Sequence, residues 1–563
     1  MNDRLRLVLS LSALALCAGC VRSPFATDPD ELGTRYPLSR LRSIDNMDMS
    51  RYAQGEASTP PTDVDTSQPP PDPFAGLDRY ELSLEQTRAW TLENNLDLQT
   101  VLVDPSIAAL DVSAEEARFE SVFRTTARYS DFDQPTDSTL SGSQFNTLNI
   151  TPEISIPLRT GGSISASLPI NRSETDNVFS TLNPSFTSDL QFSISQPLLR
   201  NAGRRANIHP IRIAALGAQI TEARTKLEVI RAVADADRAY WRLYAARRLL
   251  LVRKEQYDLA KAQLDRVERR HEAGAEADVE LIRAEAGLAD RIEGIIIAAN
   301  DVRARQRDLK RIMNADSLGP ATEIELLPMT DPDPMFFELN REALVSDALA
   351  YRSEMLELEL QLAQDASTID FSRNQMLPSA ALDYTYRVNG LGDSFTSSMG
   401  VLRENNFEDW SLGLTFETPI GNHAAHSRYH QAILRRLQRL STREARKMAI
   451  TQEVLNAADQ LETTWQRIIA ARQSVILQTR QYAAEQRQFE LGRRTSTDVL
   501  DAAASLAQAQ SAEISALADY QIAQIDLAFA TGTLLGAGKI DWQPRTTPQT
   551  DHSYTDGQPR IGG

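Results

Sequence analysis

The sequence predicts an α+β membrane protein in which long antiparallel helical hairpins alternate with amphipathic strands, in two structural repeats per chain. The longest helical stretch, 206–271, contains one glycine, Gly217, and one proline, Pro210, which lies near the start where proline is tolerated. At 1.5 Å per residue, a helix of this length spans on the order of 100 Å. Because helices of globular proteins average roughly 11 residues, the pattern indicates an elongated structural element.

Helical and strand patterns follow one another in the same order twice along the chain. Two long hairpins are expected, one turning at 273–279 and the other at 491–497. A first expected helix follows 82–85 and runs through 94–97, and further expected helices cover 106–120, 206–271, 280–313, 343–374, 424–489 and 499–535. The expected strands show strict alternation of apolar and polar residues at 123–129, 150–156, 164–170, 186–194, 382–388 and 410–416.

The strands suit the wall of a transmembrane β-barrel, because one face is apolar and the other polar. A closed barrel needs roughly eight strands or more, and each chain supplies fewer, so we expect a cyclic oligomer. The Gly161-Gly162 pair between two of the runs indicates a hairpin. With this hairpin the first repeat contributes four strands and the second two, unless the added pair forms an external hairpin above the membrane.

An internal repeat is visible around the two helical turns. Gly274 aligns with Gly492, and the segments 280–289 and 498–507 align without a gap. A period of this length indicates a duplicated unit, because solenoid repeats are about 20 to 50 residues long.

The repeats divide the chain into expected segments. These are a lipoprotein signal peptide (1–19), a Pro-rich linker (20–78), a first repeat (79–314, strands within 121–197), a connector (315–338), a second repeat (339–536, strands within 379–419) and a polar tail (537–563).

Composition excludes several functions. The net charge of −18 over 563 residues argues against nucleic acid as a partner, because nucleic-acid binders cluster Lys and Arg. The only cysteines, Cys17 and Cys20, lie at the N-terminus, so a cysteine-based metal site in the body is impossible. No run of roughly 20 apolar residues follows the leader. Catalytic triads and phosphate-binding loops are also missing, so we expect neither an enzyme nor a cofactor.

The first twenty residues indicate a lipoprotein leader. Arg4 and Arg6 precede a short apolar run, which ends in Ala18-Gly19-Cys20. This ending resembles a bacterial lipobox, in which Cys20 becomes the lipidated N-terminus. An ordinary secretory signal cleaved nearby is the alternative.

The order of elements and several motifs resemble the TolC-type outer-membrane efflux proteins over roughly residues 82–536. The motifs are 83–85 with 93–95, the strand exits 196–198 and 418–420, the first turn and, most specifically, the second turn at 491–502. The resemblance implies a homotrimer with a β-barrel in the outer membrane and a long α-helical barrel in the periplasm. It also implies a periplasmic adaptor and an inner-membrane transporter as partners. A lipid-anchored coiled-coil scaffold or adhesin of the envelope is the alternative function.

The resemblance assigns roles to the two turns. Residues Ala273, Gly274 and Ala275 of the first turn, and Leu491, Gly492 and Arg493 of the second, are expected to dock the adaptor. Arg494 and Glu280 are expected to link the turns in the closed state. The family's usual tyrosine near the second glycine is replaced here by Phe489, which has no hydroxyl to add to that link.

Two aspartates near the second turn are gate candidates. Asp498 and Asp501 lie about one helical turn apart, so in a trimer they would form two stacked rings of charge. Helix capping is the alternative, because Thr495-x-x-Asp498 is a capping-box pattern.

A weak metal candidate lies near the start of the second long helix. His423, His426 and His430 have helical spacing and could share one face. Surface histidines without a metal are the commoner explanation.

Overall fold

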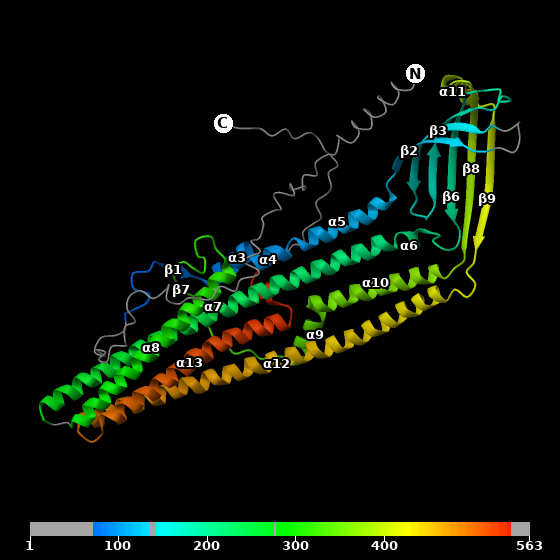
Figure 1. Ribbon diagram of the computed structural model, residues 1–563. Helices are drawn as coiled ribbons and strands as arrows, with labels where there is room; N and C mark the ends of the chain where they lie inside the picture. Colours follow the sequence, from blue (N-terminus) through cyan, green and yellow to red (C-terminus); the bar gives the residue numbers. More distant parts are fainter. Residues whose placement is uncertain (1–70, 136–141, 275–276, 542–563) are drawn as a thin grey trace. The chain divides into compact units, whose positions relative to one another are not determined.

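The computed structural model describes residues 71–135, 142–274 and 277–541, within one compact unit of residues 66–563 (Figure 1). The helices are α3 (Leu84–Asn94), α4 (Leu96–Val101), α5 (Asp104–Glu116), η2 (Ala117–Phe119), α6 (Arg204–Asn207), α7 (His209–Glu272), α8 (Asp278–Met313), α9 (Arg341–Tyr351), α10 (Ser353–Gln375), α11 (Phe395–Glu404), α12 (His423–Glu490), α13 (Ser496–Ala530) and α14 (Leu534–Ala537). The strands are β1 (Arg79–Leu82), β2 (Val122–Asp133), β3 (Gln144–Pro157), β4 (Ser163–Ser167), β5 (Ile170–Thr175), β6 (Ser185–Pro197), β7 (Glu325–Pro328), β8 (Ser379–Gly392) and β9 (Glu408–Glu417).

The two long helical hairpins are present as predicted. Helix α7 has 64 residues and pairs with α8, and α12 has 68 residues and pairs with α13. Pro210 lies in the first turn of α7, where its missing N–H leaves no intrahelical bond unmade. Helix α13 of the second repeat also packs on α7 of the first (Figure 1). The two repeats therefore share one packed body instead of forming separate domains.

The core follows the inner faces of these helices. Buried side chains of α7 such as Tyr240, Trp241 and Leu243 pack with Leu309 of α8 and Leu82 of β1. The Tyr240 hydroxyl donates to the Leu82 carbonyl oxygen at 3.2 Å and accepts from the Thr330 N–H at 2.9 Å. Because a buried phenol without partners would cost free energy, these bonds fix β1 and the segment after β7 against α7.

The single helix predicted at 343–374 is wrong in one respect, because Arg352 interrupts it. Arg352 has an extended backbone (φ −68°, ψ 128°) between α9 and α10. Its buried guanidinium pairs with Glu354 and with Glu453 of α12, at 2.5 Å each. Burial alone would raise the pKa of Glu354, but hydrogen bonds from Arg352 and Arg446 hold it below its ordinary value. This ion-pair cluster holds the break between α9 and α10 against α12. The hydrophobic periodicity of the sequence gives no sign of the break.

Three elements are new relative to the sequence prediction. β1 and β7 form a two-stranded parallel sheet in which Arg79 stands opposite Glu325. The buried Glu325 carboxylate accepts from both Arg79 and Arg247, at 3.1 and 2.7 Å. Helix α11 lies between β8 and β9. Strands of four residues and a helix of ten are too short for a strong periodic signal.

The main sheet is antiparallel and has six strand positions in the order β2, β3, β4/β5, β6, β8, β9 (Figure 1). Strands β4 and β5 follow one another in a single position, since both pair with β3 on one side and with β6 on the other. The predicted run at 164–170 is thus split at Leu168-Pro169. The predicted hairpin turn is present, with Gly161 at φ +93°, a backbone conformation that favours glycine.

The sheet has one apolar and one polar face, as the alternation predicted. Cross-strand partners place the apolar residues together; these are Phe123, Ile154, Ile164, Ile194, Tyr384 and Leu412 in successive strands. Exposed aromatic and aliphatic side chains on the edge strand β9 are Trp410, Leu412, Leu414 and Phe416. The opposite face carries mainly Ser, Thr, Asn and charged residues.

We expect the Arg352 cluster to be a main stabiliser of the contact between α9/α10 and α12. Arg352→Met should lower the free energy of unfolding by on the order of 3 kcal/mol, because it leaves Glu354 partly buried with fewer cationic partners. Urea denaturation of the detergent-solubilised protein measures this change. Arg472→Met, which removes an exposed ion pair with Glu513, is the matched control and should cost less than about 1 kcal/mol. Equal losses in the two variants would contradict the role of burial.

Candidate functional site

The second turn, between α12 and α13, has a well-defined conformation. Gly492 adopts φ +71°, and its N–H donates to the Phe489 carbonyl oxygen at 2.9 Å. The Arg493 N–H donates to the carbonyl oxygen of Gln488 at 2.9 Å. These bonds satisfy carbonyls at the end of α12. Thr495 then caps α13, so five residues separate the two helices.

Asp498 completes a capping box, as the Thr495-x-x-Asp498 pattern predicted. The Thr495 N–H and hydroxyl both donate to Asp498 Oδ2 at 2.9 Å, and Thr495 Oγ1 accepts from the Asp498 N–H at 3.3 Å. These bonds, with Arg494 nearby, hold the pKa of Asp498 below its ordinary value of 3.8. A lowered carboxyl pKa means that this interaction stabilises the fold above about pH 3.8 and is lost as pH falls through the lower folded value.

Asp501 lies one position before the next buried residue of α13 and is exposed. Its side chain makes no hydrogen bond or ion pair that the described residues supply, whereas Asp498 is used as a cap. Capping therefore accounts for Asp498 but leaves Asp501 without a role inside one subunit.

Arg494 and Glu280 do not meet within one chain. Arg494 lies 3.1 Å from Glu485 and 3.8 Å from Asp498, both in its own hairpin. Glu280 pairs with Arg283, one turn further along α8, at 2.6 Å. Glu280 Oε2 is buried and accepts no hydrogen bond from the described residues. The link between the two residues stays a prediction for contacts between copies.

The first turn resembles the second but has weaker caps. Gly274 adopts φ +68° after Ala273, which ends α7. Ala277 precedes α8 and provides no side-chain cap, in contrast to Thr495. Ala275 lies outside the described residues, as does Cys20. Both turns therefore have a glycine with positive φ, and a side-chain cap is present only before α13.

Contacts that the sequence prediction missed join the two hairpins near the turns. The Arg270 guanidinium of α7 lies over the Phe489 ring, 4.8 Å from its centre, and donates to the Phe489 carbonyl oxygen at 3.4 Å. Gln263 of α7 donates to Ser496 Oγ at 3.2 Å. Phe489 is only 2% exposed. Phe489, which has no hydroxyl, is thus held through its ring. Its partner Arg270 is distant in sequence, so only the tertiary structure reveals the contact.

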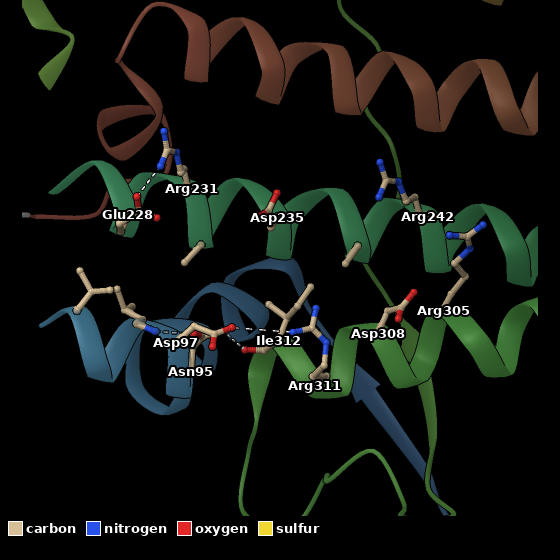
Figure 2. Close-up of a pocket in the computed structure, with 14 residues that line it drawn as sticks. Asn95, Asp97, Glu228, Arg231, Asp235, Arg242, Arg305, Asp308, Arg311 and Ile312 are labelled. Carbon is tan, nitrogen blue, oxygen red and sulfur yellow. Dashed lines mark hydrogen bonds and ion pairs between the residues drawn. The ribbon is translucent and has the colours of Figure 1, made fainter. Parts of the chain in front are cut away.

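A charged groove lies between α4, α7 and α8 (Figure 2). Its volume is about 500 Å³, and its lining includes four acidic and four basic residues: Asp97, Glu228, Asp235, Asp308, Arg231, Arg242, Arg305 and Arg311. Several are paired, such as Glu228 with Arg231 at 2.5 Å, and Arg311 lies 4.0 Å from Asp97 (Figure 2). The acidic and basic residues of the groove are equal in number, and most of them form ion pairs on exposed helices. Such a surface is hydrated and does not indicate a specific ligand or a reaction.

The weak histidine candidate does not form a metal site in the described residues. His423, His426 and His430 all lie on the first two turns of α12. Nowhere in residues 71–135, 142–274 or 277–541 do three His, Cys, Asp or Glu side chains converge in a way that could hold a metal ion. Helical spacing put the three imidazoles on neighbouring turns, but their ring nitrogens do not meet.

Comparison with known proteins finds similarity to outer-membrane efflux proteins. Residues 344–533 match the family model described as outer membrane efflux protein. The chain is similar to the outer membrane protein TolC of Vibrio cholerae, with 24% identity over 307 residues, which are 53% of this chain and 66% of that protein.

Residues 344–533 thus carry an outer membrane efflux protein domain, and the chain is a homologue of TolC. This confirms the resemblance found in the motifs.

Solved structures share the fold of the chain. The chain is similar to the CmeC outer membrane channel of Campylobacter jejuni, with a TM-score of 0.59 and 17% identity over 80% of this chain and 86% of that one. It is also similar to the outer membrane protein VceC of Vibrio cholerae, with a TM-score of 0.57 and 12% identity over 80% of this chain and 96% of that one. The predicted TolC-like fold is therefore confirmed.

We predict that the Arg270–Phe489 contact couples the two hairpins at the turns. Arg270→Met should weaken the contact by on the order of 1 kcal/mol, which raises local opening about fivefold. Hydrogen exchange of residues 485–500, followed by mass spectrometry, measures this opening. Arg269→Met, which alters the exposed neighbour, should leave exchange unchanged. If both variants exchange like the parent, the contact does not couple the hairpins.

Proposed function

We propose that the chain is the outer-membrane channel of a tripartite efflux pump or type I secretion system. In this function the sheet forms the membrane part and the helical hairpins form a periplasmic tunnel. The observation that carries the proposal is the sheet itself, which has an exposed apolar face and two edges without partners in the described chain. The match of residues 344–533 to the outer membrane efflux protein model and the similarity to TolC support it.

The two edges of the sheet are complementary. Six antiparallel positions are an even number, so the edge strands β2 and β9 run in opposite directions. β9 of one copy can therefore pair antiparallel with β2 of the next. In lipid each unpaired backbone group costs several kcal/mol, so a sheet in a membrane has to close on itself. Closure by copies of the chain supplies every edge with a partner.

The apolar face is suited to contact lipid. It carries exposed Trp410, Leu412 and Leu414 on β9, and Phe123 and Tyr129 on β2. Exposed apolar area of this extent marks a surface that water does not cover in the working protein. None of the described helices is long and apolar enough to cross a membrane, by contrast.

The helices also carry apolar side chains without a partner in one chain. On α12 the exposed ones include Leu434, Leu437, Met448, Ile469, Ile476 and Leu477. A coiled helical tunnel made by a homotrimer would cover them with helices of neighbouring copies. In the alternative function, a coiled-coil scaffold made of one chain would leave these side chains exposed to water. It would also not explain why the sheet has one apolar and one polar face.

The turns are assigned to the periplasmic end of the tunnel. We infer that Asp498 and Asp501 form charged rings at a gate, and that Arg494 and Glu280 join neighbouring copies in its closed state. Glu280 Oε2, which is buried and has no hydrogen bond from the described residues, supports the second inference. Residues 273–275 and 491–493 would contact the periplasmic adaptor, which connects to the inner-membrane transporter.

The N-terminus adds a lipid anchor to the proposal. The lipobox-like ending at Cys20 would attach the mature chain to outer-membrane lipid. Because one acyl-anchored end alone makes no pore, the sheet remains responsible for transport.

The aspartate rings should control ion flow. Asp498→Asn with Asp501→Asn should reduce cation selectivity and weaken block by multivalent cations in planar bilayers, because like charges in a narrow ring favour bound cations. Arg494→Ser should raise conductance by releasing its ion pairs at the turn, whereas Arg493→Ser is the matched control. If the double variant conducts and is blocked like the parent, the two aspartates do not line the constriction, and capping is the whole role of Asp498.

Lipidation should depend on Cys20 alone. Cys20→Ser should abolish incorporation of labelled fatty acid into the protein, because the thiol is the acceptor. Cys17→Ser, which changes the other cysteine of the leader, should retain the label. Labelling that persists in the Cys20 variant would overturn the assignment.

A further inference from the structure

We infer that the β3–β5 hairpin widens the outer-membrane exit, so that the channel passes bulky, hydrated polar solutes of polymer size through its sheet. The inference rests on the proposed function, because it requires copies of the sheet to close around a lumen. It concerns the one place where the two repeats differ most, since the first contributes four strand positions and the second only β8 and β9.

The hairpin is a full part of the sheet. β3 pairs with β2 over twelve consecutive residues, from Gln144 to Ser155. On its other edge it pairs with β4 and β5, which in turn pair with β6. The alternative of an external hairpin above the membrane is therefore wrong. β2 and β6 also run antiparallel, so they could pair directly if the hairpin were absent.

The side chains of the hairpin continue both faces of the sheet. Ile150, Ile154 and Ile164 lie on the apolar face, opposite Ala127, Phe123 and Ile194 of the flanking strands. The other face of the same strands carries Thr147, Asn149, Thr151, Ser163, Ser165 and Asn171. A hairpin outside the membrane would be surrounded by water, so an apolar face in register with the neighbouring strands would not be expected.

The helix between β8 and β9 does not fill the proposed lumen. Gly390 and Gly392 share the apolar face with Val388, and a Cβ on either would lie within 2.5 Å of the Ser398 backbone. Ser398 Oγ also lies 2.8 Å from Oγ of Ser188, which stands opposite Gly390 on that face. α11 therefore packs against the lipid-facing side, beyond the apolar band, and leaves the polar face open.

The hairpin changes the width of a closed sheet substantially. Six positions in each of three copies make eighteen, whereas four positions would make twelve. With strands about 4.8 Å apart and tilted by roughly 40°, eighteen strands enclose a backbone diameter of roughly 36 Å, and twelve roughly 24 Å. Barrels of 16–18 strands leave an open aqueous channel.

The chemistry of the polar face fits a hydrated solute. Hydroxyl and amide side chains predominate on this face of the hairpin, beside one carboxylate, Glu153, whereas the ion pair of Arg172 with Glu174 stands on the other face. Neutral hydrogen-bonding groups exchange readily with water and impose little charge selection. Most charged residues of the polar face, such as Arg128 and Asp189, lie on the other strands, so the hairpin adds width to the sheet while adding little charge selection.

The test uses purified full-length trimers in planar bilayers, with poly(ethylene glycol) of graded hydrodynamic radius added only on the side of the sheet. Polymer that enters from this side lowers conductance according to the width of the sheet, independent of the gate at the other end. The matched variant lacks residues 134–184, which a short turn replaces between β2 and β6. We expect the radius of the largest polymer that enters to be about one and a half times greater in the parent.

The outcomes separate the inference from the proposed function. A parent channel with a large cutoff that shrinks in the variant supports the inference. A parent cutoff that matches a twelve-strand barrel overturns it while leaving the channel function intact, and this holds even if the variant does not fold. If trimers form no channels at all, the proposed function fails instead.

Discussion

The hydrogen-bonding demand of the two free sheet edges is the constraint on which the rest of the structure depends. β2 and β9 present unpaired N–H and C=O groups beside an apolar face, and lipid offers these groups no substitute for water. Copies of the chain can satisfy them only by meeting edge to edge around a ring. The helices that enter and leave the sheet must then meet around the same axis, which turns two helical hairpins per chain into the wall of a tunnel.

At the turns of the hairpins, the residues that stabilise the local structure lie beside those proposed to form the gate. Thr495 and Asp498 fix the start of α13, and Arg270 holds Phe489 against the first hairpin. A gate built on such a turn is rigid within each subunit, so its opening has to come from contacts between subunits. Under the proposed function, Glu280, with one buried oxygen lacking a hydrogen bond in the described chain, would take part in such a contact.

Long periodic segments were predictable, and short or tertiary features were not. The helices α7 and α12, the alternating strands and the cap at Thr495 follow from spacing and local propensity alone. The break at Arg352 does not, because its extended backbone is held by Glu453, about a hundred residues away. The pairing of Arg270 with Phe489 was missed for the same reason. The three histidines of α12 show the opposite limit of sequence patterns: their helical spacing suggests a shared site, but spacing alone does not bring ring nitrogens together.

Cross-linking between copies tests the central claim most directly. A cysteine at Thr126 on the polar face of β2 can be combined with one at Ser411 or Thr415, on the same face of β9. Mild oxidation in membranes should give covalent dimers and trimers for at least one pair, in a ladder that ends at three. Pairs that use Ala127, whose side chain lies on the apolar face, should not cross-link. A ladder that continues beyond three, or no cross-link at any polar-face pair, would contradict closure of the sheet by three copies.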